Sequence, residues 1–376
     1  MAEKLVPRLC YILPSYDPAT GSHFFHLYEL LERAAKDLDI FLIIEKFSSC
    51  PSGLPFNNYC QKFSFAPLRI AELFFILARE RITGRKYFYT HYSFFGALAS
   101  WLVTKIFGGT AYYWNCGMPW LYRRSFFEES VFRFALSHTM LVTGTAGLAA
   151  EYSRNYGLDK RFIRILPNWI NLDRFANAKN RGYIRKKLGI STDQKIVLFV
   201  HHLSKRKGAH FVAPVAKSVT EQFKNVIFLI VGAGPESENL QLITNNLQLT
   251  DRVRLIGEVP SNKIQDYFAL ADVFFMPSEE EGFPHVLLEA MAAGVPYAAS
   301  DVGGVKEITP PMLQNYIVRS GDVDEFSAKI AALLTKPAPD IILISEEEKE
   351  WVKKYDISEA LPKFTALFTE SLNSNL

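Results

Sequence analysis

Two glutamates eight positions apart, Glu281 and Glu289, are the residues of this chain whose type and spacing are best suited to chemistry. Glu281 follows the apolar run 273–276, which is typical of a buried strand. Pro284 suits the first position of a helix, because proline lacks the N–H that such a position leaves unpaired. The pattern predicts a strand, a loop that carries one carboxylate, and a helix that carries the other.

The start of that helix would bind an anion. The backbone N–H groups of His285 and Val286 point out of the first turn, and the helix dipole is positive there, so a diphosphate fits in front of it. Helical side chains lean toward the N-terminus, so Glu289 can reach a polar group beside the anion. Ionised carboxylates form strong hydrogen bonds with hydroxyls. Glu281 and Glu289 can therefore hold two ends of one nucleotide sugar.

A structural role stays open for each glutamate alone. Glu281 would then belong to a solvated acidic loop with Glu279 and Glu280, and Glu289 would be a surface residue of an amphipathic helix.

The residues around the two glutamates resemble the donor-binding signature of retaining glycosyltransferases of family 4, the group 1 glycosyltransferases, which have the GT-B fold. The resemblance covers the Glu-x7-Glu spacing, the run Glu-Ala-Met-Ala-Ala-Gly-Val-Pro at 289–296 and the run Ser-Asp-Val-Gly-Gly-Val-Lys-Glu at 300–307. It implies an α/β protein in which two Rossmann-like domains face each other across a cleft and a C-terminal helix returns to the first domain.

The resemblance also implies an activity. It is the transfer of a sugar, with retention and without a metal ion or other cofactor, from a nucleotide diphosphate to a hydroxyl of a glycan, polysaccharide or lipid-linked acceptor. Glu281 would hold the transferred sugar, Glu289 the ribose, and Lys207 the leaving diphosphate. The other donor-binding residues that the resemblance implies are Gly21, His202, Gly257, Glu258, Val259, Gly282, Phe283, Pro284, His285 and Val286.

Some residues depart from the family pattern. The family usually has Gly-Arg-Leu where this chain has His201-His202-Leu203, so His202 replaces an arginine that binds diphosphate. A neutral histidine is a weaker and pH-dependent partner. Trp169 and Asn171 replace Gly and Asp in the segment between the domains.

The first domain should carry the acceptor site. The loop 14–22 follows the first strand, where an open α/β sheet binds ligands. Gly21 would allow close approach of the backbone, and Ser22 would either contact ligand or cap the next helix. The resemblance implies three catalytic positions, Glu281, Lys207 and Asn115. Asn115 falls where many relatives have a histidine near the reaction centre. An amide cannot act as a base, so asparagine could not take over that role of the histidine. His91, at the end of another strand, would line the cleft or play a structural role.

Composition is that of an ordinary globular protein, with 376 residues, 49% apolar and 22% charged. The four cysteines, which are Cys10, Cys50, Cys60 and Cys116, form no close-spaced pair of the kind that binds zinc or exchanges disulfides, and a protein of this size needs no disulfide. The chain start does not resemble a secretory signal, and no apolar run approaches the ~20 residues that span a bilayer. We expect reduced thiols in a cytoplasmic protein, and no metal site, because the resembled GT-B enzymes generally work without a bound divalent cation.

Short β-rich runs alternate with longer helical patterns, which predicts parallel sheets covered by helices. We expect an N-terminal domain of residues 1–175 with the returning helix at about 350–376, and a C-terminal domain of residues 176–349. The predicted strands are 9–13, 40–44, 87–90, 110–114, 140–143, 163–166, 196–200, 226–231, 253–256, 273–276 and 296–300.

Charge is unequal between the two halves. Residues 1–180 carry 21 Lys and Arg against 14 Asp and Glu, and the remainder carries 21 against 25. The basic and aromatic segments 74–81 and 120–127 either face the core of the first domain or contact an anionic membrane on its inner face. We expect no nucleic-acid partner.

Two alternatives to a glycosyltransferase stay open. One is a catalytically weak protein that binds sugar nucleotides, because His202, Asn115 and Trp169 all depart from the family pattern. The other is a nucleotide-sugar epimerase, which would need further carboxylates in the first domain. The residues do not distinguish a uridine from a guanosine donor.

Overall fold

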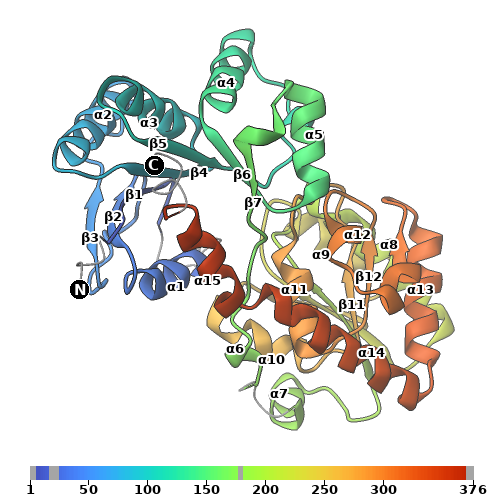
Figure 1. Ribbon diagram of the computed structural model, residues 1–376. Helices are drawn as coiled ribbons and strands as arrows, with labels where there is room; N and C mark the ends of the chain where they lie inside the picture. Colours follow the sequence, from blue (N-terminus) through green and yellow to red (C-terminus); the bar gives the residue numbers. More distant parts are fainter. Residues whose placement is uncertain (1–5, 17–24, 177–180, 370–376) are drawn as a thin grey trace. The chain divides into compact units, whose positions relative to one another are not determined.

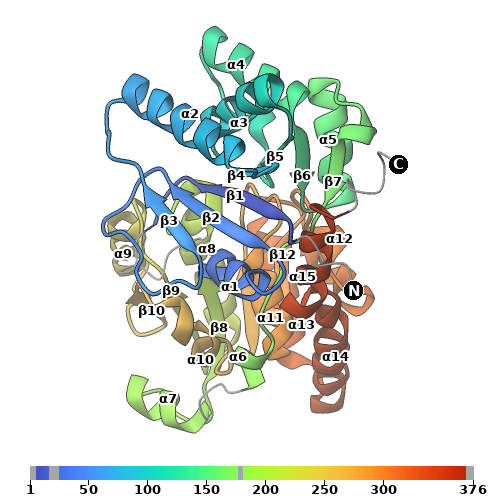
Figure 2. The ribbon, with the colours of Figure 1, turned by 60° about the vertical axis from the view of Figure 1, so that its left-hand side comes forward.

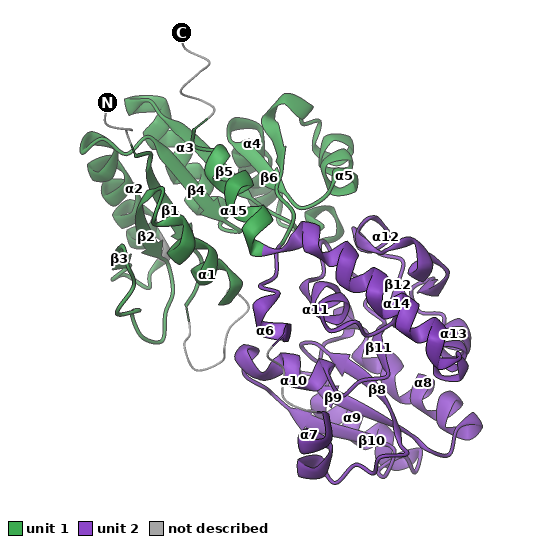
Figure 3. Cartoon of the chain, turned by 60° about the horizontal axis from the view of Figure 1, so that its bottom comes forward, with its two compact units in different colours: residues 1–168, 357–376 green, residues 169–356 purple. Residues whose placement is uncertain are grey.

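The computed structural model describes residues 6–16, 25–176 and 181–369. Its internal contacts divide the chain into two compact units (Figure 3). Unit 1 comprises residues 1–168 and 357–376, and unit 2 comprises residues 169–356. The sequence placed the two boundaries at 175/176 and near 350, whereas the contacts place them at 168/169 and 356/357.

Unit 1 is built on a seven-stranded parallel sheet with the order β3-β2-β1-β4-β5-β6-β7. Its strands are β1 (Arg8–Leu13), β2 (Asp39–Ile44), β3 (Asn57–Cys60), β4 (Tyr87–His91), β5 (Thr110–Trp114), β6 (Met140–Thr143) and β7 (Ile163–Ile165). Its helices are α1 (Phe25–Ala34), α2 (Ala66–Ile82), α3 (Phe94–Phe107), α4 (Phe126–His138), α5 (Ala146–Tyr156) and α15 (Ile357–Ala366).

Successive side chains of a strand point to opposite faces, and β1 uses both faces of the unit 1 sheet. Cys10 and Ile12 pack into the apolar cluster beneath α2 and α3. Tyr11 points the other way, where its ring lies against Phe364, close to the end of α15. Figures 1 and 2 show α2 and α3 on one side of the sheet and α1 with α15 on the other. From Leu9 to Leu13 the strand is buried and has no charged residue, because both faces are covered.

Unit 2 has a six-stranded parallel sheet with the order β10-β9-β8-β11-β12-β13. Its strands are β8 (Lys195–Val200), β9 (Val226–Val231), β10 (Val253–Gly257), β11 (Val273–Met276), β12 (Tyr297–Ser300) and β13 (Ile317–Val318). Its helices are α6 (Asp173–Ala176), α7 (Arg181–Leu188), α8 (Ala209–Gln222), α9 (Ser237–Asn246), α10 (Ile264–Phe268), α11 (His285–Ala293), α12 (Val305–Ile308), α13 (Val323–Thr335) and α14 (Ala338–Trp351). Helix α8 packs against α9 and α13, and α11 packs against α10 and α14.

The chain passes from unit 2 to unit 1 through a 3-10 turn and not through one long helix. The sequence predicted a returning helix at about 350–376, but α14 ends at Trp351, the 3-10 turn Val352–Tyr355 follows, and α15 begins at Ile357. The Asp356 carboxylate then accepts a hydrogen bond from the Leu172 N–H at 3.1 Å. This contact ties the exit of the chain to its entry and breaks the helix. Beyond it, α15 returns to unit 1 as predicted.

Each of the eleven predicted strands is present, and two further strands were missed. Strand β3 has the sequence Asn-Asn-Tyr-Cys and lies at an edge of its sheet with no fully buried residue. Strand β13 is only two residues long. Neither has the apolar run that identifies a central strand, because an edge strand needs less apolar surface.

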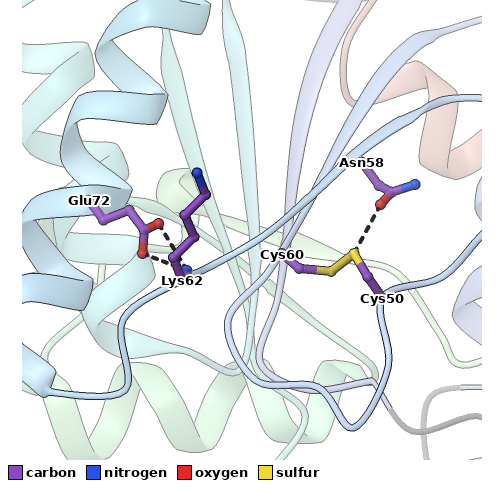
Figure 4. The surroundings of a disulfide bond; sticks show 5 residues. All are labelled: Cys50, Asn58, Cys60, Lys62 and Glu72. Atoms are coloured by element: carbon purple, nitrogen blue, oxygen red, sulfur yellow. Dashed lines mark hydrogen bonds between the residues drawn. A yellow bond between two sulfur atoms is a disulfide. The ribbon is translucent and has the colours of Figure 1, made fainter.

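A disulfide joins Cys50 to Cys60, with the two Cα atoms 6.1 Å apart (Figure 4). Cys60 ends β3, and the bond ties the loop before that strand to its last residue. The expectation that all four cysteines are reduced is therefore wrong for this pair, because the loop and the edge strand meet only in the fold. Cys10 and Cys116 are buried free thiols. The expected cytoplasmic location thus loses the support that it drew from reduced cysteines.

Glu72 anchors the chain beyond the disulfide. Its two carboxylate oxygens accept hydrogen bonds from the backbone N–H of Lys62 at 2.9 and 3.1 Å (Figure 4).

In the described part of the chain, no helix combines the length and the apolar character needed to cross a membrane.

We expect reduction of the disulfide to lower the free energy of unfolding of unit 1 by at most about 2–3 kcal/mol, because the bond closes a loop between residues ten positions apart. Thiol titration of the denatured protein, purified without reductant, should find two thiols and not four. Urea unfolding with and without reductant measures the change. The Cys50→Ser/Cys60→Ser variant is the control and should not respond to reductant; four thiols in the untreated protein would contradict the bond.

Candidate functional site

The residues singled out in unit 2 meet at the carboxyl ends of β8 and β11, which are neighbours in the sheet. Glu281 lies in the loop between β11 and α11. His201 directly follows β8, and Lys207 ends the 3-10 turn Lys205–Lys207 that leads into α8. In open parallel sheets, ligands bind at this end of the strands.

Glu281 is buried, with 5% of its surface exposed. Its Oε1 atom accepts three hydrogen bonds, from Lys207 Nζ at 2.7 Å, His201 Nε2 at 2.8 Å and Ser278 Oγ at 2.8 Å. A solvated acidic loop would make no such contacts, so the structural alternative for Glu281 is wrong.

The contacts of Glu281 keep it ionised. Burial by itself would raise the pKa of the carboxyl group, but the charge of Lys207 and the hydrogen bonds from His201 and Lys207 outweigh it and hold the pKa well below its ordinary value. A carboxylate with so low a pKa is a poor proton acceptor. Glu281 is therefore suited to bind hydroxyl groups and not to remove their protons.

Lys207 is buried with Glu281 and shares its charge. Burial lowers the pKa of the ammonium group, and the adjacent Glu281 carboxylate opposes that shift. The Glu281 carboxylate, 2.7 Å away, favours the protonated form of the ammonium group. A lysine has three N–H donors. Lys207 directs one to Glu281 Oε1 and approaches the Glu280 carbonyl oxygen at 3.4 Å, which leaves donor capacity for a ligand.

Two glycines let the chain close around the Glu281 loop. Gly208 has φ +71°, and a Cβ atom there would lie 2.0 Å from the Pro277 carbonyl oxygen. Gly303 has φ +52°, and a Cβ atom there would lie 1.6 Å from the Glu281 carbonyl oxygen. Only glycine fits such positions. The turns before α8 and α12 thus hold the loop from both sides.

Helix α11 begins one residue later than predicted. Pro284 is the N-cap, with an extended backbone, and His285 is the first helical residue. No side chain caps this end of the helix. Proline still suits the position, because it donates no hydrogen bond there. Binding of an anion at the first turn of α11 stays a prediction.

Glu289 lies on α11 with 8% of its surface exposed, so it is not a surface residue. Its Oε1 atom is 3.7 Å from His285 Nδ1, beyond hydrogen-bonding distance. The other ring nitrogen of His285, Nε2, lies 2.8 Å from the Trp169 carbonyl oxygen and donates to it. Glu289 therefore stands beside the helix start with its carboxylate not used by that histidine.

Four of the remaining predicted donor residues of unit 2, Gly257, Glu258, Val259 and Gly282, lie at or beside backbone hydrogen bonds between loops. Gly257 ends β10, and its carbonyl oxygen accepts from the Gly232 N–H at 2.8 Å, which places Glu258 and Val259 near the end of β9. Gly282 accepts a hydrogen bond from the Gly304 N–H at 3.0 Å.

Phe283 packs on protein. Its ring lies edge-on to Tyr355, with centroids 5.6 Å apart. His202 is exposed, while its neighbour His201 contacts Glu281. The structure thus brings together Glu281, Lys207 and the start of α11, and directs His202 away from Glu281.

The predicted site residues of unit 1 have structural partners where they are described. Asn115 donates to the Tyr113 hydroxyl at 3.1 Å and accepts from the Gly117 N–H at 2.8 Å. His91 is 1% exposed, and its Nδ1 atom lies 3.0 Å from the Tyr11 hydroxyl. A catalytic role for Asn115 stays a prediction.

Gly21 and Ser22 were predicted in the first domain, and Trp169 and Asn171 were noted as departures from the family pattern. Gly21 and Ser22 lie outside the described residues. Trp169 is buried, and Asn171 accepts from the Asp173 N–H at 3.1 Å, so both serve the start of unit 2.

His201 and Ser278 contact Glu281 directly, and neither was among the predicted site residues. His201 follows the last apolar residue of β8, so its place at the carboxyl end of a strand was the signal that could have identified it. Ser278 had no signal, because a serine beside a loop proline is common.

Across the three described stretches of the chain, no cluster of three or more His, Cys, Asp or Glu side chains is arranged to hold a metal ion. The positive groups of the site are Lys207 and the first turn of α11.

Comparison with known proteins places unit 2 in a family. Residues 180–354 match the family model described as "Glycosyl transferases group 1". The 2-deoxystreptamine glucosyltransferase of Streptomyces kanamyceticus is 28% identical over 60% of this chain and 58% of its own length. The N-acetyl-alpha-D-glucosaminyl L-malate synthase of Bacillus anthracis is 29% identical over 55% of this chain and 53% of its own length. The matched regions span little more than half of these relatives.

Solved structures resemble the whole chain. HepE from Anabaena, crystallised in complex with UDP and glucose, superposes with a TM-score of 0.79 over 98% of this chain and 100% of its own, at 15% sequence identity. Likeness at that identity concerns the fold alone. The chain therefore has the GT-B fold, and its residues 180–354 match the model of the glycosyl transferases group 1 family.

Proposed function

We propose that the protein is a retaining, metal-independent hexosyltransferase of family 4, which moves a sugar from a nucleotide diphosphate to an acceptor hydroxyl. The observation that carries the proposal is the buried Glu281–Lys207 pair beside the uncapped start of α11, with Glu289 on the same helix. An anion and a hydroxyl-rich group are the two parts of a nucleotide sugar, and this arrangement has a partner for each.

In this proposal Lys207 and the first turn of α11 bind the diphosphate. The lysine retains donor capacity beyond its contact with Glu281, and the helix supplies N–H groups and the positive end of its dipole. Preorganised donors of this kind stabilise the charge that develops on a leaving diphosphate. They do so without a divalent cation.

Glu281 binds the transferred sugar, and Glu289 binds the ribose. Because the low pKa of Glu281 makes it a weak base, its role is to accept hydrogen bonds from sugar hydroxyls. A mechanism without an enzyme nucleophile, in which the leaving phosphate accepts the acceptor's proton, agrees with this assignment and with retention.

The acceptor is a glycan, polysaccharide or lipid-linked hydroxyl, held by unit 1. Unit 1 also carries a surface suited to an anionic membrane. At the start of α4, Phe126 is 91% and Phe127 72% exposed, and the exposed Arg123 precedes them. Phe75 of α2 is 71% exposed, although its neighbour Phe74 packs on the core. Exposed aromatic and basic side chains together favour peripheral contact with such a membrane.

A panel of UDP- and GDP-sugars tests the activity. We expect slow release of free sugar from at least one of them, and the same rate in the presence of a chelator. A catalytically weak binding protein would release none, and an epimerase would change the sugar without releasing it. Loss of activity on chelation, restored by magnesium or manganese, would contradict the metal-independent mechanism.

Replacing each glutamate separates the two proposed contacts. We expect Glu281→Gln to weaken binding of the tightest nucleotide sugar in that panel by about 10- to 150-fold, the equivalent of a lost charge-assisted hydrogen bond, and to leave the free nucleoside diphosphate unaffected. Glu289→Gln should weaken both ligands. Calorimetric titration measures both, and the exposed Glu279→Gln is the matched control. Equal effects of Glu281→Gln on both ligands would remove its sugar contact.

Vesicle binding tests the membrane surface. We expect the protein to sediment with vesicles of phosphatidylglycerol and phosphatidylcholine, and less with phosphatidylcholine alone. The Phe126→Ser/Phe127→Ser variant should bind at least about tenfold more weakly, because each buried phenylalanine contributes roughly 1.5–3 kcal/mol. Phe162→Ser, at another exposed phenylalanine of unit 1, is the control. Binding that ignores both the lipid charge and the aromatic residues would exclude this surface.

A further inference from the structure

His201 is held between two partners that determine where its proton lies. The backbone N–H of His202 donates to Nδ1 of the His201 ring at 3.1 Å. A backbone N–H is always a donor, so Nδ1 carries a lone pair. The single proton of the neutral ring is then on Nε2, which lies 2.8 Å from Glu281 Oε1 and donates to it.

The surroundings of His201 favour this neutral form. Burial is the main cause that lowers the pKa of the ring, and the charge of Lys207 lowers it further. Arg206 acts in the same direction, and Glu281 opposes it. A proton on Nδ1 would also place two donors 3.1 Å apart. His201 thus contributes a hydrogen bond to Glu281 without a second positive charge.

The hydrogen bond from His201 completes one oxygen of Glu281 and leaves the other open. Oε1 accepts from His201, Lys207 and Ser278, which exceeds the two lone-pair sites of a carboxylate oxygen. Oε2 accepts no hydrogen bond from the described residues. A ligand hydroxyl therefore has Oε2 as its acceptor on Glu281.

We propose that His201 is a positioning residue that orients Glu281, so that Oε2 alone is presented to the hydroxyls of the transferred sugar. This proposal rests on the proposed function, in which Glu281 binds that sugar. The resembled signature usually has glycine at position 201. His201 acts through Glu281 and affects recognition of the sugar, while Lys207 and the first turn of α11 bind the nucleoside diphosphate.

Two substitutions of similar size separate the hydrogen bond from the volume of the ring. Leucine fills the space without a donor, and the amide nitrogen of glutamine can donate from near the position of Nε2. We expect His201→Leu to weaken the tightest nucleotide sugar of the panel by about 10- to 100-fold, as for a lost hydrogen bond to a charged group, and to leave the free nucleoside diphosphate unchanged. His201→Gln should stay within about threefold of the wild type.

The Glu281→Gln background shows whether His201 acts through Glu281. In that background His201→Leu should cause no further loss, because the two residues form one interacting unit. If Glu281→Gln weakens the nucleotide sugar and His201→Leu does not, the positioning role is overturned and the proposed function stands. If Glu281→Gln does not weaken binding of the nucleotide sugar, the proposed function itself is contradicted, whatever the effect of His201→Leu.

Thermal unfolding of His201→Leu shows whether the substitution destabilises the fold as a whole. If His201→Leu does not fold, His201→Asn replaces it, because its shorter amide cannot reach Glu281 and should behave unlike His201→Gln. An equal loss of nucleotide sugar and free nucleoside diphosphate in the folded variant would also overturn the proposal.

Discussion

The ion pair between Glu281 and Lys207 is the constraint on which the site depends. Both side chains are buried, and removing two charges from water costs several kcal/mol per ion unless each charge is paired and hydrogen-bonded. The pair meets that condition with a contact of 2.7 Å and with two further donors, His201 and Ser278. Loss of either charge would leave the other buried without its partner, so we expect a change at one of the two residues to lower the stability of unit 2.

The backbone around the pair follows from this requirement. Lys207 follows β8 in the chain, and Glu281 follows β11. Because these strands are neighbours in the sheet, the two side chains meet at their carboxyl ends. The loops can approach closely only because Gly208 and Gly303 have no side chain. The result is a rigid carboxylate beside the open end of a helix, and such preorganisation is what binding and charge stabilisation need. The fold alone does not define the function, since the GT-B fold is shared with proteins only 15% identical.

A buried carboxylate with one open oxygen also limits how a ligand can bind. Three protein donors already use Oε1, so the direction from which a hydroxyl approaches is set before any ligand arrives. The neutral His201 holds this arrangement without adding charge. In the proposed function, recognition of the sugar and neutralisation of the diphosphate involve the same pair of residues through different atoms.

The elements and the candidate site residues could be predicted from the sequence. Strands such as β8, β9 and β11 are short apolar runs buried on both faces; Lys207 follows β8, Glu281 follows β11, and Glu289 lies on α11 eight positions after Glu281. The contacts of these residues could not be predicted, because their partners are distant in the chain. The Cys50–Cys60 bond, the edge strand β3 and the break before α15 arise from segments that meet after folding. The place of His201 on Glu281 depends on a contact across 80 positions of the chain, which no local pattern contains.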